Sequence, residues 1–177
     1  MQRIFVAIRP PAAVRATLLA AMGGIEGARW QDEEQLHLTL RFCGESEAWR
    51  TDELHARLAA LAFAPFPLAL RGVGHFEKQG RVHTLWAGLA PSEPLTALQA
   101  KVERACQAAG YAPEGRRFAP HITLARGNQR PAAVAGWIAD HALLAGAPWQ
   151  VDGFALYESQ LSLGGARYVA LDHYLAR

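Results

Sequence analysis

The sequence predicts a mixed protein of the α/β or α+β class, with two pseudo-symmetric lobes around a cleft. Three observations predict it. Strand-like and helix-like stretches alternate along the 177 residues, their order repeats at an offset of about 84 residues, and one short motif occurs once in each repeat. Alternating strands and helices pack as layers around a shared core. A chain of this length fits one large domain or two small lobes.

Hydrophobic periodicity defines the elements of the first half. Short apolar runs predict strands, and longer amphipathic stretches predict helices. The expected elements are strand 3–8 (RIFVAI), helix 12–22, strand 36–42 (LHLTLRF), helix 47–62 and strand 66–73.

The second half repeats this order. Glycines at 72, 74 and 80, in the segment GVGHFEKQG, predict a loop near the midpoint of the chain. No linker-like tract separates the halves, so we expect one bilobal domain over residues 1–177 with an internal duplication. The expected elements are strand 82–89 (VHTLWAGL), helix 93–109, strand 118–126 (FAPHITLAR), helix 131–143, strand 149–157 and a last strand at 166–175.

Composition is that of an ordinary globular protein, with 51% hydrophobic and 19% charged residues. The net charge of +2 names no polyanionic partner. Sixteen of the eighteen basic residues are arginine, which favours phosphate contacts but also reflects codon composition. No apolar run approaches the roughly 20 residues that span a bilayer. Cys43 and Cys106 lack metal-ligand or disulfide spacing, so a reducing cytoplasm is expected.

The motif His-x-Thr occurs at His37 and Thr39 and again at His121 and Thr123. Side chains of a strand alternate between its faces, so each motif presents one imidazole and one hydroxyl to one side. The aliphatic residues between them face the core. Pseudo-symmetry would bring the two pairs together across the cleft.

Two facing imidazoles form a credible acid/base couple, because a pKa near 6.5 lets one be neutral while the other is protonated. The neutral ring can activate water and the charged ring can protonate a leaving oxygen. Threonine hydroxyls can donate to phosphate oxygens. A cyclic phosphodiester suits this apparatus, and neither motif has the nearby ligands of a familiar metal site. Residues alone lead to phosphoryl chemistry but not to RNA.

The chain resembles the two-histidine phosphoesterases, and among them the RNA 2′,3′-cyclic phosphodiesterases, also called 2′-5′ RNA ligase-like proteins. The resemblance covers nearly the whole chain: the opening RIFVAIRPP, HLTLRF with the following Gly-Glu, VHTLWAGL, PHITLAR and FALYES. It implies an α+β fold, with two pseudo-symmetric lobes of antiparallel sheet and outer helices around a central cleft. It also implies cofactor-free and metal-independent opening of an RNA 2′,3′-cyclic phosphate to a 2′-phosphomonoester.

Residue roles follow from the same resemblance. His37 is the expected proton donor, His121 the proton acceptor, and Thr39 and Thr123 bind the phosphate. Arg126 resembles an additional phosphate-binding cation. Its odd offset from His121 would place it on the opposite face of an ideal strand, so this role requires a strand end or a bulge.

Other residues have weaker claims. Arg41 has the parity of a site residue but is also readily explained as a solvated surface residue. Aromatic residues near the motifs could stack on a base or belong to the core. Histidines outside the motifs are expected to be structural or exposed. The aromatic residues are Phe5, Phe42, Trp86 and Tyr157. The histidines outside the motifs are His55, His75, His83, His141 and His173.

The leading function is therefore a hydrolase acting on RNA or nucleotides with a 2′,3′-cyclic phosphate end. A 2′-5′ RNA ligase acting in the same site is the alternative enzyme. A non-catalytic RNA-end or nucleotide binder would keep the fold but has no need for two complete motifs. We expect a monomer without membrane association.

Overall fold

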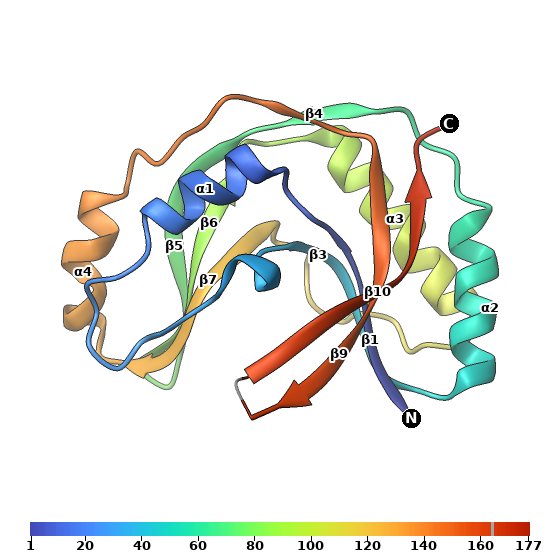
Figure 1. The fold of residues 1–177 in the computed structure, drawn as a ribbon, viewed down its shortest axis with the longest axis horizontal. Coiled ribbons are helices and arrows are strands. Elements are labelled where there is room, and N and C mark those ends of the chain that lie inside the picture. Colours follow the sequence, from blue (N-terminus) through green and yellow to red (C-terminus); the bar gives the residue numbers. More distant parts are fainter. Residues whose placement is uncertain (164) are drawn as a thin grey trace.

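A computed structural model describes residues 1–163 and 165–177 of the chain. Figure 1 shows strands in the middle of the molecule and helices on its two sides. The described helices are α1 (Ala12–Ala20), α2 (Ala48–Ala59), α3 (Glu93–Ala108), α4 (Pro131–Asp140) and the 3₁₀ turn η1 (Glu33–Gln35). The described strands are β1 (Gln2–Ile8), β2 (Arg29–Trp30), β3 (Leu38–Ser46), β4 (Phe66–Leu68), β5 (Leu70–Lys78), β6 (Arg81–Leu89), β7 (His121–Gln129), β8 (Trp149–Val151), β9 (Gly153–Ser162) and β10 (Gly165–Leu175).

The main sheet is antiparallel and runs in the order β10-β9-β1-β3-β7-β6-β5, with β2 beside β7. Its two lobes meet where β3 and β7 pair, through Leu38 and Ile122. A small second sheet joins β4 to β8, with Pro67 opposite Gln150. The predicted α+β class with two lobes of antiparallel sheet and outer helices is confirmed.

The two halves of the sequence exchange elements between the lobes. Strand β9, from the second half, pairs with β1, whereas β5, from the first half, pairs with β6. Helix α3 lies against β3, where Gln99 donates from Nε2 to the Leu40 carbonyl at 3.4 Å. Helix α4 lies beside α1, where Trp137 Nε1 donates to the Ala21 carbonyl at 2.9 Å. Each lobe therefore contains segments from both halves (Figure 1).

Strand pairing supports the predicted duplication. Leu38 and Ile122, which pair at the junction of the lobes, are 84 positions apart. Pro67 and Gln150, which pair in the small sheet, are 83 positions apart. A residue on a two-fold axis pairs with its own equivalent, so both pairs would lie near the axis that the predicted duplication implies. The duplication and the single bilobal domain stay predictions.

The predicted loop is confirmed at Gln79 and Gly80 but is wrong for Gly72 and Gly74. Residues 70–78 form β5, and only Gln79 and Gly80 make the turn to β6, both with positive φ (52° and 71°) as in a two-residue hairpin. Gly72 has φ 68° beside a register shift in β5. A Cβ at Gly74 would lie 2.4 Å from the Trp86 indole. Within the strand, Gly72 therefore allows the bulge and Gly74 leaves room for the indole of Trp86.

Other elements agree with the predictions except at their ends. Helices α1, α2 and α4 stop two or three residues early, and the two motif strands extend further toward their carboxyl ends. The predicted strands at 66–73 and 149–157 are each interrupted by one residue, Ala69 or Asp152, where the chain passes from the small sheet to the main one. Among the described residues, no helix is long and apolar enough to cross a membrane.

Candidate active site

His37 lies one residue before β3 and is held by the turn that precedes it. A capping box closes this turn: the Gln35 N–H donates to the Asp32 carboxylate, and the Asp32 N–H donates to the Gln35 side chain, both at 3.1 Å. Gln35 Nε2 also donates to the Ala166 carbonyl in β10 at 2.7 Å. The Gln35 carbonyl then accepts from His37 Nδ1 at 2.6 Å. The imidazole is thus oriented by backbone that is itself fixed.

His121 opens β7 and is held in the same way. Its Nδ1 donates to the Ala119 carbonyl at 2.7 Å. Pro120 restricts the preceding residue to extended backbone, which fixes this carbonyl. Because a carbonyl oxygen can only accept, Nδ1 of His37 and of His121 carries the proton. Nε2 of each ring remains available to hold a lone pair or a second proton.

The motif side chains alternate between faces as predicted. The aliphatic residues on one face are almost completely buried, while the histidines and threonines on the other face are half-buried beside the cleft. The buried residues are Leu38, Leu40, Ile122 and Leu124; the half-buried ones are His37, Thr39, His121 and Thr123.

A bulge in β7 places Arg126 on the face of the histidine. On β6, Trp86 lies opposite Thr123, and the preceding residue, Leu85, lies opposite Ala125. Leu124 on β7 therefore has no partner on β6. Leu124 and Ala125 are consecutive, yet both are buried, at 0% and 1% exposure. Alternation is therefore shifted by one position, and Arg126 shares the face of Thr123. This is the geometry that its predicted role requires.

An equivalent bulge in β3 turns Arg41 away from the cleft. On β1, Ala7 lies opposite Thr39, and the preceding residue, Val6, lies opposite Arg41. Leu40 on β3 therefore has no partner on β1. Phe42, 43% exposed, therefore takes the position that Arg126 has in the other motif. The two motifs thus differ here, with a cation in one and an aromatic ring in the other.

Arg41 is a buried structural residue, so its interpretation as a solvated surface residue is wrong. It is 8% exposed. Its Nε donates to the Glu103 carboxylate of α3 at 2.5 Å, and its other nitrogens donate to the carbonyls of Phe42 and Ala112, both at 2.5 Å. The bulge explains the difference, because strict alternation would have left Arg41 on the cleft face.

Aromatic rings flank both histidines. Two rings contact each imidazole, and one ring on each side meets it edge to face. They contribute to the half-buried environment in which an acid/base group changes its pKa. The ring centroids are separated by 4.9 Å for Phe5 and His37, 5.0 Å for Tyr168 and His37, 4.8 Å for Phe76 and His121, and 6.2 Å for Trp86 and His121.

Burial lowers the pKa of both imidazoles, that of His37 from 6.5 to about 4 and that of His121 in the same direction. The hydrogen bonds to Gln35 and Ala119 oppose this shift. The positive charge of Arg126 lowers both pKa values further, so this guanidinium acts on both rings. Both histidines are therefore mostly neutral near pH 7 in the absence of an anion.

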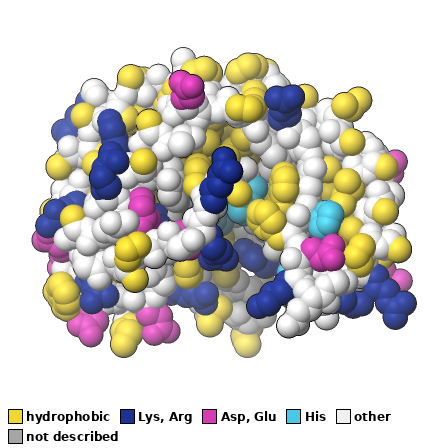
Figure 2. Space-filling model, turned by 180° about the vertical axis from the view of Figure 1, so that it is seen from behind, with side chains coloured by type: hydrophobic (Ala, Val, Ile, Leu, Met, Phe, Trp, Pro, Cys, Tyr) yellow, Lys and Arg dark blue, Asp and Glu magenta, His cyan; other side chains and the backbone are white. Residues whose placement is uncertain are grey.

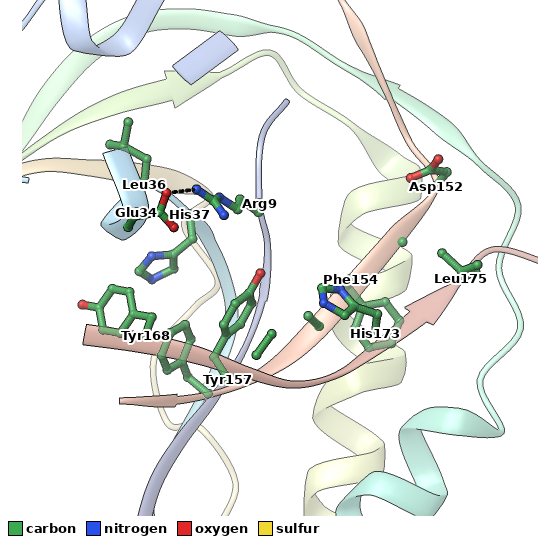
Figure 3. A pocket seen from close by; sticks show the side chains of 14 residues that line it. Arg9, Glu34, Leu36, His37, Asp152, Phe154, Tyr157, Tyr168, His173 and Leu175 are labelled. Carbon is green, nitrogen blue, oxygen red and sulfur yellow. Dashed lines mark ion pairs between the residues drawn. The ribbon is translucent and has the colours of Figure 1, made fainter. Parts of the chain in front are cut away.

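A groove of about 370 Å³ opens beside His37 and follows β9 and β10 (Figure 3). Tyr157 and Tyr168 line its near end, and Asp152 and His173 line its far end. His37 is the motif histidine in its wall. Figure 2 shows a hollow near the middle of one face of the molecule, with a histidine at its wall and Lys or Arg side chains around it.

The predicted aromatic residues divide between core and cleft. Phe5 is 3% exposed and packs beneath His37. Phe42 is exposed under the guanidinium of Arg3, 5.1 Å from it. Trp86 and Tyr157 are half-buried on the cleft face. These last two rings have the position that a base-stacking residue needs.

Three residues near the site were missing from the predictions, and a fourth, His173, was predicted to be structural or exposed. The sequence Asp32-Glu-Glu-Gln35 is a capping-box signal and could have identified Gln35. Phe76 was hidden by the predicted loop. Tyr168 could not have been found, because nothing in the sequence says that β10 lies beside the first motif. His173 is exposed, as predicted, and it lines the groove for the same reason.

Other candidate ligands and thiols lie apart from the site. His55 Nδ1 is 3.0 Å from the Tyr174 hydroxyl, and His141 Nδ1 donates to the Trp137 carbonyl at 2.8 Å. Cys43 and Cys106 are free thiols. In the part of the chain that the structure describes, no three His, Cys, Asp or Glu residues are grouped to hold a metal ion.

This fold with two His-x-Thr motifs defines the class of two-histidine phosphoesterases. The model of the 2′-5′ RNA ligase superfamily matches residues 9–162, and the chain belongs to this superfamily. The resemblance deduced from the motifs is therefore confirmed.

Several relatives and a solved structure are similar to this chain. A Thermus thermophilus protein named RNA 2′,3′-cyclic phosphodiesterase is 35% identical over 99% of this chain and 90% of its own length. An Aeropyrum pernix protein with the same name is 38% identical, but the match spans only 54% of each protein. A match to a Geobacillus stearothermophilus protein covers 32% of that protein. The crystal structure of Escherichia coli LigT in apo form aligns with a TM-score of 0.81 and 27% identity, covering 99% and 97% of the two chains.

Proposed function

We propose that this protein hydrolyses RNA 2′,3′-cyclic phosphate ends to 2′-phosphomonoesters. The observation that carries the proposal is the matched pair of imidazoles, each fixed through Nδ1 to a backbone carbonyl, with Arg126 acting on both. The names of the relatives, RNA 2′,3′-cyclic phosphodiesterase, support the same substrate. Structures of E. coli LigT complexed with 3′-AMP and with ATP support a nucleotide ligand.

The reaction is an in-line displacement at phosphorus. His121 Nε2 accepts a proton from water, whose oxygen bonds to phosphorus on the side opposite the ribose O3′. The P–O3′ bond breaks, and His37 Nε2 gives its proton to O3′. Thr39 and Thr123 donate to non-bridging oxygens, and Arg126 offsets their charge. The products are a 3′-hydroxyl and a 2′-phosphate.

Assignment of His37 as the acid rests on the family. Its lowered pKa favours the neutral ring in the free protein, which opposes this role. A bound phosphate diester carries one negative charge that offsets Arg126 and raises the pKa of both histidines. The negative charge of the bound substrate therefore stabilises the protonated form of His37.

The decisive test is hydrolysis of a short RNA that ends in a 2′,3′-cyclic phosphate, in EDTA, with separation of 2′- and 3′-phosphate products. We expect turnover to the 2′-phosphate in EDTA, because the acid, the base and the charge stabilisation all come from side chains. Binding without turnover would instead indicate an RNA-end binding protein. Formation of a 2′-5′ linkage from the 2′,3′-cyclic phosphate end and an RNA with a free 5′-hydroxyl would indicate the ligase after which the superfamily is named, with the 5′-hydroxyl in place of water as the group that bonds to phosphorus.

The pH dependence should be displaced to the acid side. Both histidine pKa values in the free protein lie below 6.5, and kcat/KM reports the free enzyme. As pH rises above them, the acid loses its proton; as pH falls below them, the base gains one. We expect a bell-shaped kcat/KM profile with its maximum below pH 6.5 and a fall of about tenfold per pH unit above it. A plateau that extends beyond pH 7.5 would contradict this.

Replacement of Arg126 should move this profile. In Arg126→Met the pKa of both histidines rises because the neighbouring positive charge is lost, so both limbs of the bell shift to higher pH. Loss of a charged hydrogen bond to phosphate should also lower kcat/KM by about 10- to 100-fold. Arg126→Lys is the control, because lysine keeps the positive charge but cannot make the bidentate hydrogen bonds of a guanidinium. Its activity should therefore fall while both limbs of the pH profile stay in place. An unmoved profile in Arg126→Met would place Arg126 outside the site.

A cytoplasmic location and a monomeric state stay predictions. The spacing of Cys43 and Cys106 supports the first. Size-exclusion chromatography with light scattering would test the second.

A further inference from the structure

The groove beside His37 gives the cleft two unlike sides. On the His37 side, a cavity of about 370 Å³ continues along the inner surface of β9 and β10. On the His121 side, the wall is made by Phe76 and by Trp86, whose ring lies flat over Gly74. The pseudo-symmetry of the motifs therefore does not extend to the surfaces that would contact the rest of a substrate.

The charges of the groove fit a neutral group better than a phosphate. Its one Lys or Arg is Arg9, whose guanidinium pairs with Glu34 at 3.0 Å. A second carboxylate, Asp152, lines the far end of the groove (Figure 3). Two carboxylates and one paired cation repel a phosphate, but they can accept hydrogen bonds from the amino or imino groups of a base.

The groove also offers aromatic surface at the right place. Tyr157 lies in the middle of the close-up and is stacked on Phe5 through one face, with centroids 5.3 Å apart and an interplanar angle of 15° (Figure 3). Tyr157 and Ala155 share a face of β9, and His173 on β10 pairs with Ala155. Tyr157 and His173 therefore line one continuous surface. Nucleic-acid bases commonly stack on such rings.

In-line geometry decides which side the nucleoside occupies. The ribose is attached to phosphorus through the leaving O3′ and the retained O2′, so it lies away from the attacking water. If His121 activates the water and His37 protonates O3′, the sugar and its base extend on the His37 side. That is the side on which the groove opens.

We propose that the groove along β9 and β10 binds the terminal nucleoside that bears the cyclic phosphate, with its base between Tyr157 and His173. The assignment rests on the proposed function and makes these two residues determinants of substrate affinity. It also ties the position of the groove to the roles of the two histidines. A water molecule approaches from the opposite side, past Phe76 and Trp86.

Two substrates that differ only in the base test this directly: adenosine 2′,3′-cyclic phosphate and methyl ribofuranoside 2,3-cyclic phosphate. Wild type should prefer the nucleotide. In His173→Ala and Tyr157→Leu, KM for the nucleotide should rise about tenfold with kcat retained, because a base stacked on an aromatic ring is lost. The preference for the nucleotide over the base-free substrate should shrink by the same factor. His83→Ala, on exposed β6 surface outside the groove, is the matched control.

Failure of this proposal is distinct from failure of the proposed function. Absence of turnover by wild type on any cyclic phosphate removes the function itself. Full wild-type activity with unchanged KM and preference in both variants removes the groove as the nucleoside site. If Phe76→Ala raises KM for the nucleotide instead, the nucleoside lies on the His121 side, and the roles of the two histidines are reversed. His173 is exposed, so its variant tests the proposal even if Tyr157→Leu does not fold.

Discussion

Replacing either motif histidine by alanine is expected to lower kcat for cyclic phosphate hydrolysis by about 10² to 10⁴, the usual contribution of a positioned acid or base. In the proposed mechanism, His121→Ala removes the group that accepts the proton of water, and His37→Ala leaves O3′ without a proton donor. Because the two groups act in one step, the double variant should lose much less than the product of the single losses. Rates with a cyclic nucleotide at saturation measure all three.

The matched control is His141→Ala. His141 also donates from Nδ1 to a backbone carbonyl, that of Trp137 at 2.8 Å, but it lies at the end of α4 outside the site. Its replacement removes the same chemical group and the same kind of hydrogen bond, so its rate should stay near that of wild type. A single motif variant that keeps more than a tenth of wild-type kcat would show that its histidine is not the acid or the base.

Arg41→Met should destabilise the protein by about 3 kcal/mol, the low end for breaking a buried ion pair. The variant leaves the Glu103 carboxylate with little exposure and without its cation. Glu103 keeps hydrogen bonds from Gln107 and from the Glu114 N–H, so the loss stays at the low end. Urea unfolding gives the free energy of unfolding, and the slope should be unchanged.

Two further variants separate charge burial from the simple loss of an arginine. Arg57→Met breaks an exposed pair with Glu53 on α2, and should cost about 0.5 kcal/mol. Arg41→Met combined with Glu103→Leu removes the unpaired carboxylate and should recover about 1 kcal/mol or more. If Arg41→Met costs no more than Arg57→Met, the buried ion pair does not stabilise the fold.

Local sequence was sufficient to predict the faces of the motif strands. Alternation in His-Leu-Thr-Leu depends only on the period of a strand, and burial of Leu38 and Leu40 follows it. The same rule failed at the next residue, Arg41. A bulge is defined by the register of the neighbouring strand, which a motif four residues long does not contain.

Non-local packing explains what else the sequence did not predict. Tyr168 contacts His37 from a strand more than a hundred residues away, and the order of strands that brings it there is set by the whole sheet. Gly74 looked like part of a loop, because a glycine that makes room for an indole on the next strand has the same sequence signal as one in a turn. Both errors concern contacts with a neighbouring strand, which the local sequence does not contain.

The exchange of strands between the lobes has a consequence for the stability of each half on its own. A peptide with only the first half would contain β1 and β3 but not the β9 that pairs with β1, and its β5 would lack β6. Two copies of such a half, arranged around a two-fold axis, would supply each other with the missing edge. A separately expressed first half is therefore expected to leave these strand edges unpaired unless a second copy covers them, so its folding should depend on protein concentration.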